Sequence, residues 1–332
     1  MGVFQVDEIH KEILEDISET CLRVYGMEIM DSFPIYRGWL NLKWQVRTEQ
    51  GMYLIKQFNK ERFQKYSNEE LHFAYTQQER LFLHNVPCPK LFPIDRQYLL
   101  KSGKGERFMI MEFCKGSILQ PGTATELHMY QLGKATGRMH RVLNDANTPR
   151  KKNPEFIAPS LEHRINYWHS VLKDAEGKRK QSIISIIEKQ MQVTQSMKLE
   201  DFTLHDTGWA HRDLFMDNIL FQEDQVSAIL DFDRLKYDYP QLDVARAVIS
   251  GCLSDNGLNV SAATAFMEGY KEERKVDEGY LYKALCLLWY MESTWWIEAD
   301  MDEFIGPPVR FAEEMLWLGE NLQELESWLN DL

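Results

Sequence analysis

Several features that define common protein classes are scarce or missing in this 332-residue sequence. The five cysteines (Cys21, Cys88, Cys114, Cys252 and Cys286) are scattered and form no C-x-x-C pair, so neither a disulfide framework nor a zinc site is indicated. No apolar run approaches the roughly 18 residues of a membrane span. The first residues carry acids and no uninterrupted apolar block, so we expect no secretory signal and a cytoplasmic protein.

Basic residues are also fewer than acidic residues in this sequence. The 38 Lys and Arg residues are outnumbered by 51 Asp and Glu residues, which gives a formal net charge of −13. Nucleic-acid and anionic-membrane binding depend on basic patches, so we expect neither kind of partner. An acidic surface is compatible with attracting a cationic small molecule, and the alternative is that the acids only keep the protein soluble.

The first third of the sequence predicts a small, mostly antiparallel sheet accompanied by helices. Apolar residues at helical spacing predict a helix over 5–30, and a capping Ser or Asn followed by Glu begins a second over 67–84. Four segments that suit strands are 39–46, 52–58, 91–100 and 106–114. The expected domains are an N-terminal helix (1–29) and a β-rich lobe (30–113).

Residues 114–332 predict a mainly helical second lobe, so the fold class is α+β. The segments with helical periodicity are 125–143, 161–174, 178–198, 242–252, 259–273, 277–299 and 307–330. Gly133 and Gly137 lie inside the first of these, where each costs roughly 1 kcal/mol against alanine. We therefore expect that helix to pack tightly against a neighbour.

One short stretch, residues 210–234, gathers the polar groups on which the rest depends. Apolar runs at 218–221 and 226–230 flank a polar turn and predict a hairpin. Asp213 is placed to orient an attacking hydroxyl and accept its proton, while Asn218 and Asp231 offer the hard oxygen ligands that Mg²⁺ prefers. This arrangement is suited to phosphoryl transfer.

A lysine in the first lobe adds to this interpretation. Lys56 lies inside the strand expected at 52–58, where a lysine otherwise simply points to solvent. The helix that follows carries acids, and of these Glu79 suits an ion pair with Lys56 best because it lies nearest the apolar C-terminal half.

The motifs His211–Asn218 (H-x-D-x-x-x-x-N), Ile229–Asp233 and Asp243–Ala245, downstream of the lysine and glutamate, resemble the aminoglycoside phosphotransferase/choline kinase family. Homoserine kinase-like members are the most similar, and the resemblance covers about residues 30 to 320. It implies a two-lobed, protein-kinase-like fold and ATP- and Mg²⁺-dependent transfer of the γ-phosphoryl group to a small-molecule hydroxyl.

The resemblance also implies a role for each residue of the second lobe's motifs. Asp213 is similar to the family's catalytic aspartate, and Asn218 and Asp231 are similar to its metal ligands. Asp243 resembles an aspartate that braces the catalytic loop, and His211 resembles a structural residue of that loop.

In the first lobe the resemblance implies a nucleotide site. Lys56 is similar to the lysine that holds the nucleotide phosphates, with Glu79 as its ion-pair partner. The backbone groups of Glu112, Phe113 and Cys114 resemble the hinge that binds the adenine edge.

The sequence departs from the family pattern at three places. Arg212 follows His211 where many members have glycine, which alters loop packing or offers an anion site. Asp233 stands where protein kinases have the glycine of Asp-Phe-Gly, and it is a second metal ligand, a possible acceptor contact or a family-typical acid. The expected phosphate loop, 34–41, contains one glycine, Gly38, which predicts a looser clamp on the triphosphate.

The acceptor is expected to bind among the C-terminal helices. Glu292, Trp295 and Trp296, with Glu298 and Asp300 nearby, combine acids with indole faces and predict a site for an ammonium group. In the alternative, the tryptophans are core residues and the acids are solvated. Homoserine, choline, a methylthio sugar and an aminoglycoside all suit the same catalytic centre.

Two other classes of protein compete with a small-molecule kinase. A pseudokinase or structural relative of the spore-coat type usually loses at least one catalytic residue, and here Lys56, Asp213, Asn218 and Asp231 are all present. A protein Ser/Thr kinase needs a long activation segment with an Ala-Pro-Glu motif, whereas about ten residues separate Asp231 from Asp243.

Overall fold

The structure is a computed structural model that describes residues 3–36, 41–199 and 206–329. The chain forms two compact units, Met1–Gly116 with Ser227–Asp233, and Ser117–Val226 with Arg234–Leu332. Residues 37–40 of the expected phosphate loop, including Gly38, lie outside the described residues.

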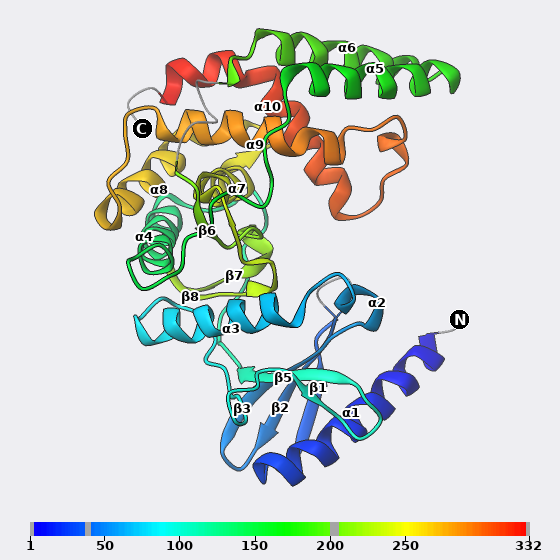
Figure 1. The fold of residues 1–332 in the computed structure, drawn as a ribbon, viewed down its shortest axis with the longest axis vertical. Helices are drawn as coiled ribbons and strands as arrows, with labels where there is room; N and C mark the ends of the chain where they lie inside the picture. The colour runs from blue at the N-terminus through cyan, green and yellow to red at the C-terminus, as the bar shows by residue number, and fades with distance from the viewer. Residues whose placement is uncertain (1–2, 37–40, 200–205, 330–332) are drawn as a thin grey trace. The chain divides into compact units, whose positions relative to one another are not determined.

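The first unit is built on a five-stranded antiparallel sheet with the strand order β1-β2-β3-β5-β4 (Figure 1). Its strands are β1 (Asp31–Pro34), β2 (Leu42–Thr48), β3 (Gly51–Gln57), β4 (Leu100–Lys101) and β5 (Arg107–Glu112). Its helices are α1 (Val3–Tyr25), α2 (Lys60–Phe63) and α3 (Asn68–Leu83). Ser67 and Glu70 form a capping box that begins α3, as the sequence predicted.

The two faces of this sheet carry separate apolar clusters because side chains alternate along each strand. Ile17 of α1 packs with Trp44 and Ile55 on one face. Tyr75 of α3 packs with Phe58 and other residues on the opposite face. Lys56 follows Ile55 in β3, so alternation directs its side chain to the α3 face.

The expected strand over 91–100 is wrong except at its end. Asp95 and Arg96 both have positive φ, 48° and 64°, so the chain turns there rather than extending. A turn closed by reciprocal backbone hydrogen bonds between Ile94 and Gln97 precedes β4. The short strand β1 was not predicted.

The second unit consists mainly of helices, and the expected α+β fold is therefore observed. The helices are α4 (Glu126–Leu143), α5 (Leu161–Gly177), α6 (Gln181–Ser196), α7 (Pro240–Cys252), α8 (Val260–Glu273), α9 (Tyr280–Trp296) and α10 (Pro307–Leu329), with 3₁₀ turns at Met216–Asn218, Phe232–Arg234 and Met301–Glu303. The short strands are β6 (Gly208–Ala210), β7 (Ile219–Gln222), β8 (Gln225–Ile229), β9 (Lys236–Asp238), β10 (Leu253–Ser254) and β11 (Gly257–Leu258); β8 and the second 3₁₀ turn pass into the first unit. No helix among the described residues is long and apolar enough to span a membrane.

The close packing expected of α4 is confirmed, and α8 is its neighbour. A Cβ on Gly133 would lie 1.9 Å from the carbonyl oxygen of Phe266, and one on Gly269 would lie 2.1 Å from that of Tyr130. These glycines allow the two helix backbones to pack in direct contact.

Candidate active site

A buried carboxylate holds the backbone of the loop that follows β6. Asp243, in the first turn of α7, accepts hydrogen bonds from the backbone N–H groups of His211 (2.5 Å) and Arg212 (2.8 Å). Burial alone would raise the pKa of Asp243, but hydrogen bonding and attraction from His140, which lies 3.1 Å away, hold it below its usual value. The carboxylate therefore stays charged and fixes the loop backbone.

Asp213 lies at the exposed side of this loop with its carboxylate oriented by two neighbours. One carboxylate oxygen accepts a hydrogen bond from Asn218 Nδ2 at 3.0 Å, and the other accepts one from Arg234 at 3.2 Å. Asn218 also donates to the backbone carbonyl of Asp213 at 2.8 Å. Both donated bonds use the amide nitrogen, so the amide oxygen of Asn218 is the atom that can ligate a cation.

Arg212 occupies a backbone conformation that favours glycine, with φ +67°. Its guanidinium is 2.8 Å from the carboxylate of Asp238 in β9 and lies over the ring of Phe156. Burial raises the pKa of Asp238 to about 6 even though Arg212 and Arg246 oppose the shift. Arg212 is thus already paired within the protein, and it ties the loop to β9.

In the first unit, Lys56 is paired with two carboxylates of the segment that follows β8. Its Nζ donates to Asp231 at 2.9 Å and to Asp233 at 2.7 Å. Asp233 also accepts a hydrogen bond from the Tyr75 hydroxyl of α3 at 2.9 Å. Burial alone would lower the pKa of Lys56, but attraction by the two carboxylates outweighs it and the pKa is raised.

The expected ion pair between Lys56 and Glu79 is wrong. Glu79 instead accepts a hydrogen bond from the Tyr98 hydroxyl at 2.5 Å. The residue of α3 that connects to Lys56 is Tyr75, one helical turn before Glu79. Its hydroxyl donates to Asp233, which accepts a hydrogen bond from Lys56. The possible acceptor contact of Asp233 is also contradicted, because its side chain is 2% exposed and engaged by both partners.

The expected hinge lies at the end of β5. The backbone N–H of Glu112 is already bonded to the carbonyl of Lys90 at 2.8 Å. The role of Glu112, Phe113 and Cys114 as a hinge stays a prediction, and the N–H groups of Phe113 and Cys114 have no backbone acceptor among the described residues.

The residues expected to bind a cationic acceptor differ from one another in their surroundings. Glu292 is buried and accepts a hydrogen bond from Arg246 at 3.1 Å, so its charge is balanced internally and the expected role of a free anion is wrong. Trp295 is 41% exposed and packs edge-on against Phe156. Trp296 packs against Phe311, with ring centroids 4.7 Å apart.

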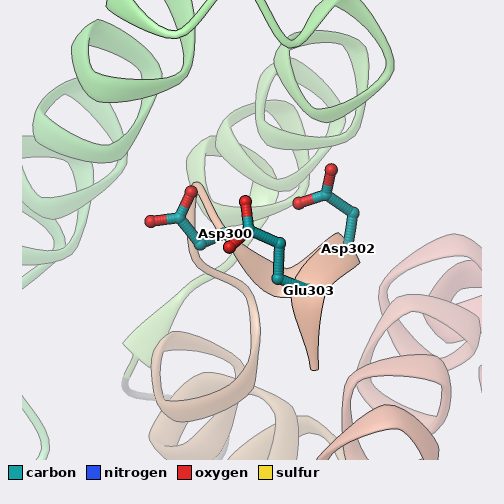
Figure 2. A group of neighbouring side chains, drawn as sticks. All are labelled: Asp300, Asp302 and Glu303. Carbon is teal, nitrogen blue, oxygen red and sulfur yellow. The ribbon is translucent and has the colours of Figure 1, made fainter. Parts of the chain in front are cut away.

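Asp300 belongs to an acidic cluster with Asp302 and Glu303, and the three carboxylates lie within 4.8 Å of one another (Figure 2). Lys180 donates to all three at 2.7–2.9 Å, and Lys178 also pairs with Asp300. The lysine ammonium occupies the place where a metal ion would sit. This cluster ties the start of α6 to the segment after α9, and Asp300 is not available to an acceptor.

Three residues around these groups were missed by sequence reasoning. Tyr75 lies one helical turn before Glu79 on the same helix, so its position was accessible from the helical spacing. Arg234 directly follows Asp233 and was visible as a cation at the end of the motif. Glu314 of α10 gave no signal, because a single acid in an amphipathic helix is ordinarily solvated.

Comparison with known proteins gives concordant results. Residues 34–279 match the model of a phosphotransferase enzyme family. A homoserine kinase of Sinorhizobium fredii is 24% identical over 272 residues, covering 81% of this chain and 78% of that protein. One from a Bradyrhizobium strain is 25% identical over 285 residues, covering 84% and 82%.

Solved structures show the same fold. A spectinomycin phosphotransferase in complex with ADP and spectinomycin aligns with a TM-score of 0.61 at 13% identity, covering 93% of this chain and 98% of that chain. An aminoglycoside phosphotransferase from Alicyclobacillus acidocaldarius aligns with a TM-score of 0.60 at 13% identity, covering 91% of each chain.

Proposed function

Because this chain belongs to the phosphotransferase enzyme family and is a small-molecule kinase, we propose that it transfers the γ-phosphoryl group of ATP to a small alcohol. The observation that supports the reaction most is the loop that carries Asp213. Its backbone is fixed by Asp243, and its carboxylate is oriented by Asn218 and Arg234. Phosphoryl transfer proceeds through a loose transition state, so positioning of this kind is the main task of the protein.

Asp213 acts on the acceptor in this proposal. Its carboxylate accepts a hydrogen bond from the attacking hydroxyl, aligns the oxygen with the γ-phosphorus and takes the proton as the new P–O bond forms. Asn218 and Arg234 hold the carboxylate in one orientation.

Asp231 and Asn218 are the proposed magnesium ligands. The carboxylate of Asp231 and the amide oxygen of Asn218 are hard oxygen donors, which suits Mg²⁺. When bound, the ion would neutralise charge on the β- and γ-phosphates. Lys56, buried and held charged by its carboxylate partners, is the proposed phosphate-binding cation. The Cys114 N–H, with the Glu112 carbonyl, is the proposed contact to adenine.

The relatives support a proposal for the class of acceptor. The two homoserine kinases act, by name, on a small alcohol that carries an amine. Both match at least three-quarters of this chain's length. We therefore propose an amine-bearing alcohol of about the size of homoserine as the acceptor.

A transfer assay tests this proposal. The protein is incubated with γ-labelled ATP and Mg²⁺ against L-homoserine, ethanolamine, choline, kanamycin, glucose and casein. We expect labelled product with one or more of the small amine-bearing alcohols and none with casein. EDTA should abolish transfer, and excess Mg²⁺ should restore it.

Transfer to casein alone would contradict the small-molecule assignment. Absence of transfer to every acceptor, together with no binding of a nonhydrolysable ATP analogue, would contradict the proposed reaction.

A further inference from the structure

A small cavity lies directly behind the loop that carries Asp213. Phe215, two residues after Asp213, forms part of its wall together with Trp296 and Phe311. Its volume of about 10 Å³ is room for one water molecule or one group of similar size. All of its lining residues belong to the second unit.

The charged residues around this cavity leave one carboxylate without a full partner. Arg246 lines the cavity but is balanced by Glu292. Glu314, 7% exposed, accepts no hydrogen bond from any described residue. Its nearest cation is Arg310, at 3.4 Å, which also pairs with Asp217 at 2.7 Å. Arg212, which pairs with Asp238, also lies 3.9 Å from Glu292. Three guanidinium groups thus face four carboxylates (Asp217, Asp238, Glu292 and Glu314), which leaves a deficit of one positive charge.

The pKa of Glu314 agrees with this deficit of positive charge. Burial raises the pKa of Glu314 to about 7, because Arg310 compensates only part of the lost hydration. A buried acid in this condition is stabilised by any cation that enters beside it.

Three aromatic rings lie against the cavity, and protein cations already lie over two of them. The guanidinium of Arg246 is 5.4 Å from the ring centroid of Phe215, and that of Arg310 is 4.8 Å from the centroid of Phe311. The ring centroids of Phe215 and Phe311 are 4.8 Å apart, and those of Trp296 and Phe311 are 4.7 Å apart. All three side chains are only half-buried, so the aromatic wall extends to the protein surface. Aromatic faces attract ammonium groups, most strongly where water is excluded.

We propose that this cavity receives the ammonium group of the acceptor, with Glu314 as its counter-charge and Phe215, Trp296 and Phe311 as its wall. The inference rests on the proposed function and deepens it, since it assigns the binding site of the acceptor's amine. An ammonium group has about the volume of a water molecule and therefore suits the cavity. Phe215 lies two positions after Asp213 in the same loop, with only Leu214 between them, so the cavity wall and the catalytic carboxylate are close along the chain.

Calorimetric titration of the 332-residue chain tests this site without requiring turnover. The probes form matched pairs that differ by one amine: L-homoserine with 4-hydroxybutyrate, and ethanolamine with ethylene glycol. The variant Glu314→Gln removes the counter-charge, and Glu313→Gln is its matched control because Glu313 is exposed on the same helix. Phe311→Leu serves as a second variant that retains the charge.

We expect at least one amine probe to bind the wild type more tightly than its amine-free partner. Glu314→Gln should weaken that binding roughly tenfold to a hundredfold, the usual effect of losing one charged contact. Phe311→Leu should weaken it less, and Glu313→Gln should leave it unchanged.

Equal binding of amine and amine-free probes, equal losses in Glu313→Gln and Glu314→Gln, or no binding of either amine would overturn the site. Amine binding that disappears in Glu314→Gln, in a protein without phosphoryl transfer, would support the site and remove the proposed function instead. Thermal unfolding of each variant shows whether it is folded.

Discussion

The contact between Lys56, Asp233 and Tyr75 gives the sharpest prediction for the first unit. Asp233→Asn removes a buried charge that accepts bonds from Lys56 at 2.7 Å and Tyr75 at 2.9 Å. We predict that it destabilises the protein more than Glu79→Gln, a substitution of the acid that the sequence favoured as the partner of Lys56.

The magnitude follows from what remains after the substitution. Removing one member of a buried ion pair costs about 3–5 kcal/mol when the other charge is left alone. Lys56 keeps Asp231 at 2.9 Å, so we expect the lower end, about 3 kcal/mol. Tyr75→Phe removes one hydrogen bond to a charged group and should cost about 1.5–3 kcal/mol. Glu79→Gln retains an acceptor for Tyr98 and should cost about 1 kcal/mol or less.

Urea unfolding followed by fluorescence measures these differences. The control is Asp255→Asn, an exposed acid that should change stability by less than about 0.5 kcal/mol. The double variant Tyr75→Phe with Asp233→Asn should cost less than the sum of the single variants, because both remove the same bond. A loss in Glu79→Gln as large as that in Asp233→Asn would refute the reasoning.

Two further predictions concern the second unit. Gly133→Ala places a Cβ 1.9 Å from the Phe266 carbonyl oxygen and should lower the free energy of unfolding by about 1–3 kcal/mol or more. Gly177→Ala is the control, because a Cβ there has no atom within 4 Å, and it should leave the stability unchanged or raise it by up to about 1 kcal/mol. Thermal unfolding measures both effects. Glu314 has a folded-state pKa of about 7 against an ordinary value of 4.5, so the native state binds the extra proton between these values. Wild-type stability relative to Glu314→Gln should therefore fall by about 3 kcal/mol as pH rises from 4.5 to 7 and stay level above it. A difference that does not vary with pH, measured by urea unfolding at pH 5 and pH 8, would contradict this assignment.

Most helices could be predicted from the sequence because their apolar residues recur at helical spacing. The helices α4 and α10, for example, begin and end within one residue of the ranges expected from periodicity. Strands such as β6 and β9 have three residues each, which is too few for an alternating pattern. They exist because they pair with each other, and that contact is remote in sequence.

The partners of Lys56 were unpredictable for the same reason. Asp231 and Asp233 lie 175 and 177 residues away, and no local pattern connects them to β3. Glu79 was favoured because it lies nearest the apolar C-terminal half of its helix, but the structure uses Tyr75, a residue type that is not expected in an ion pair. The motif positions around Asp213 were visible because their spacing is fixed by one short loop, whereas Glu314 acquires its environment only from packing.

The measurement that tests the central claim most directly is turnover by Asp213→Asn. Nucleotide binding should stay within about twofold of wild type. The substitution replaces a carboxylate that acts on the acceptor by an amide of the same shape, and it leaves Lys56 and Asp231 unchanged. The kcat for the best amine-bearing alcohol should fall by about 10²–10⁴, the usual contribution of a positioned general base. Asp224→Asn, in the turn between β7 and β8, should retain wild-type turnover. Turnover by Asp213→Asn within tenfold of wild type would contradict the account.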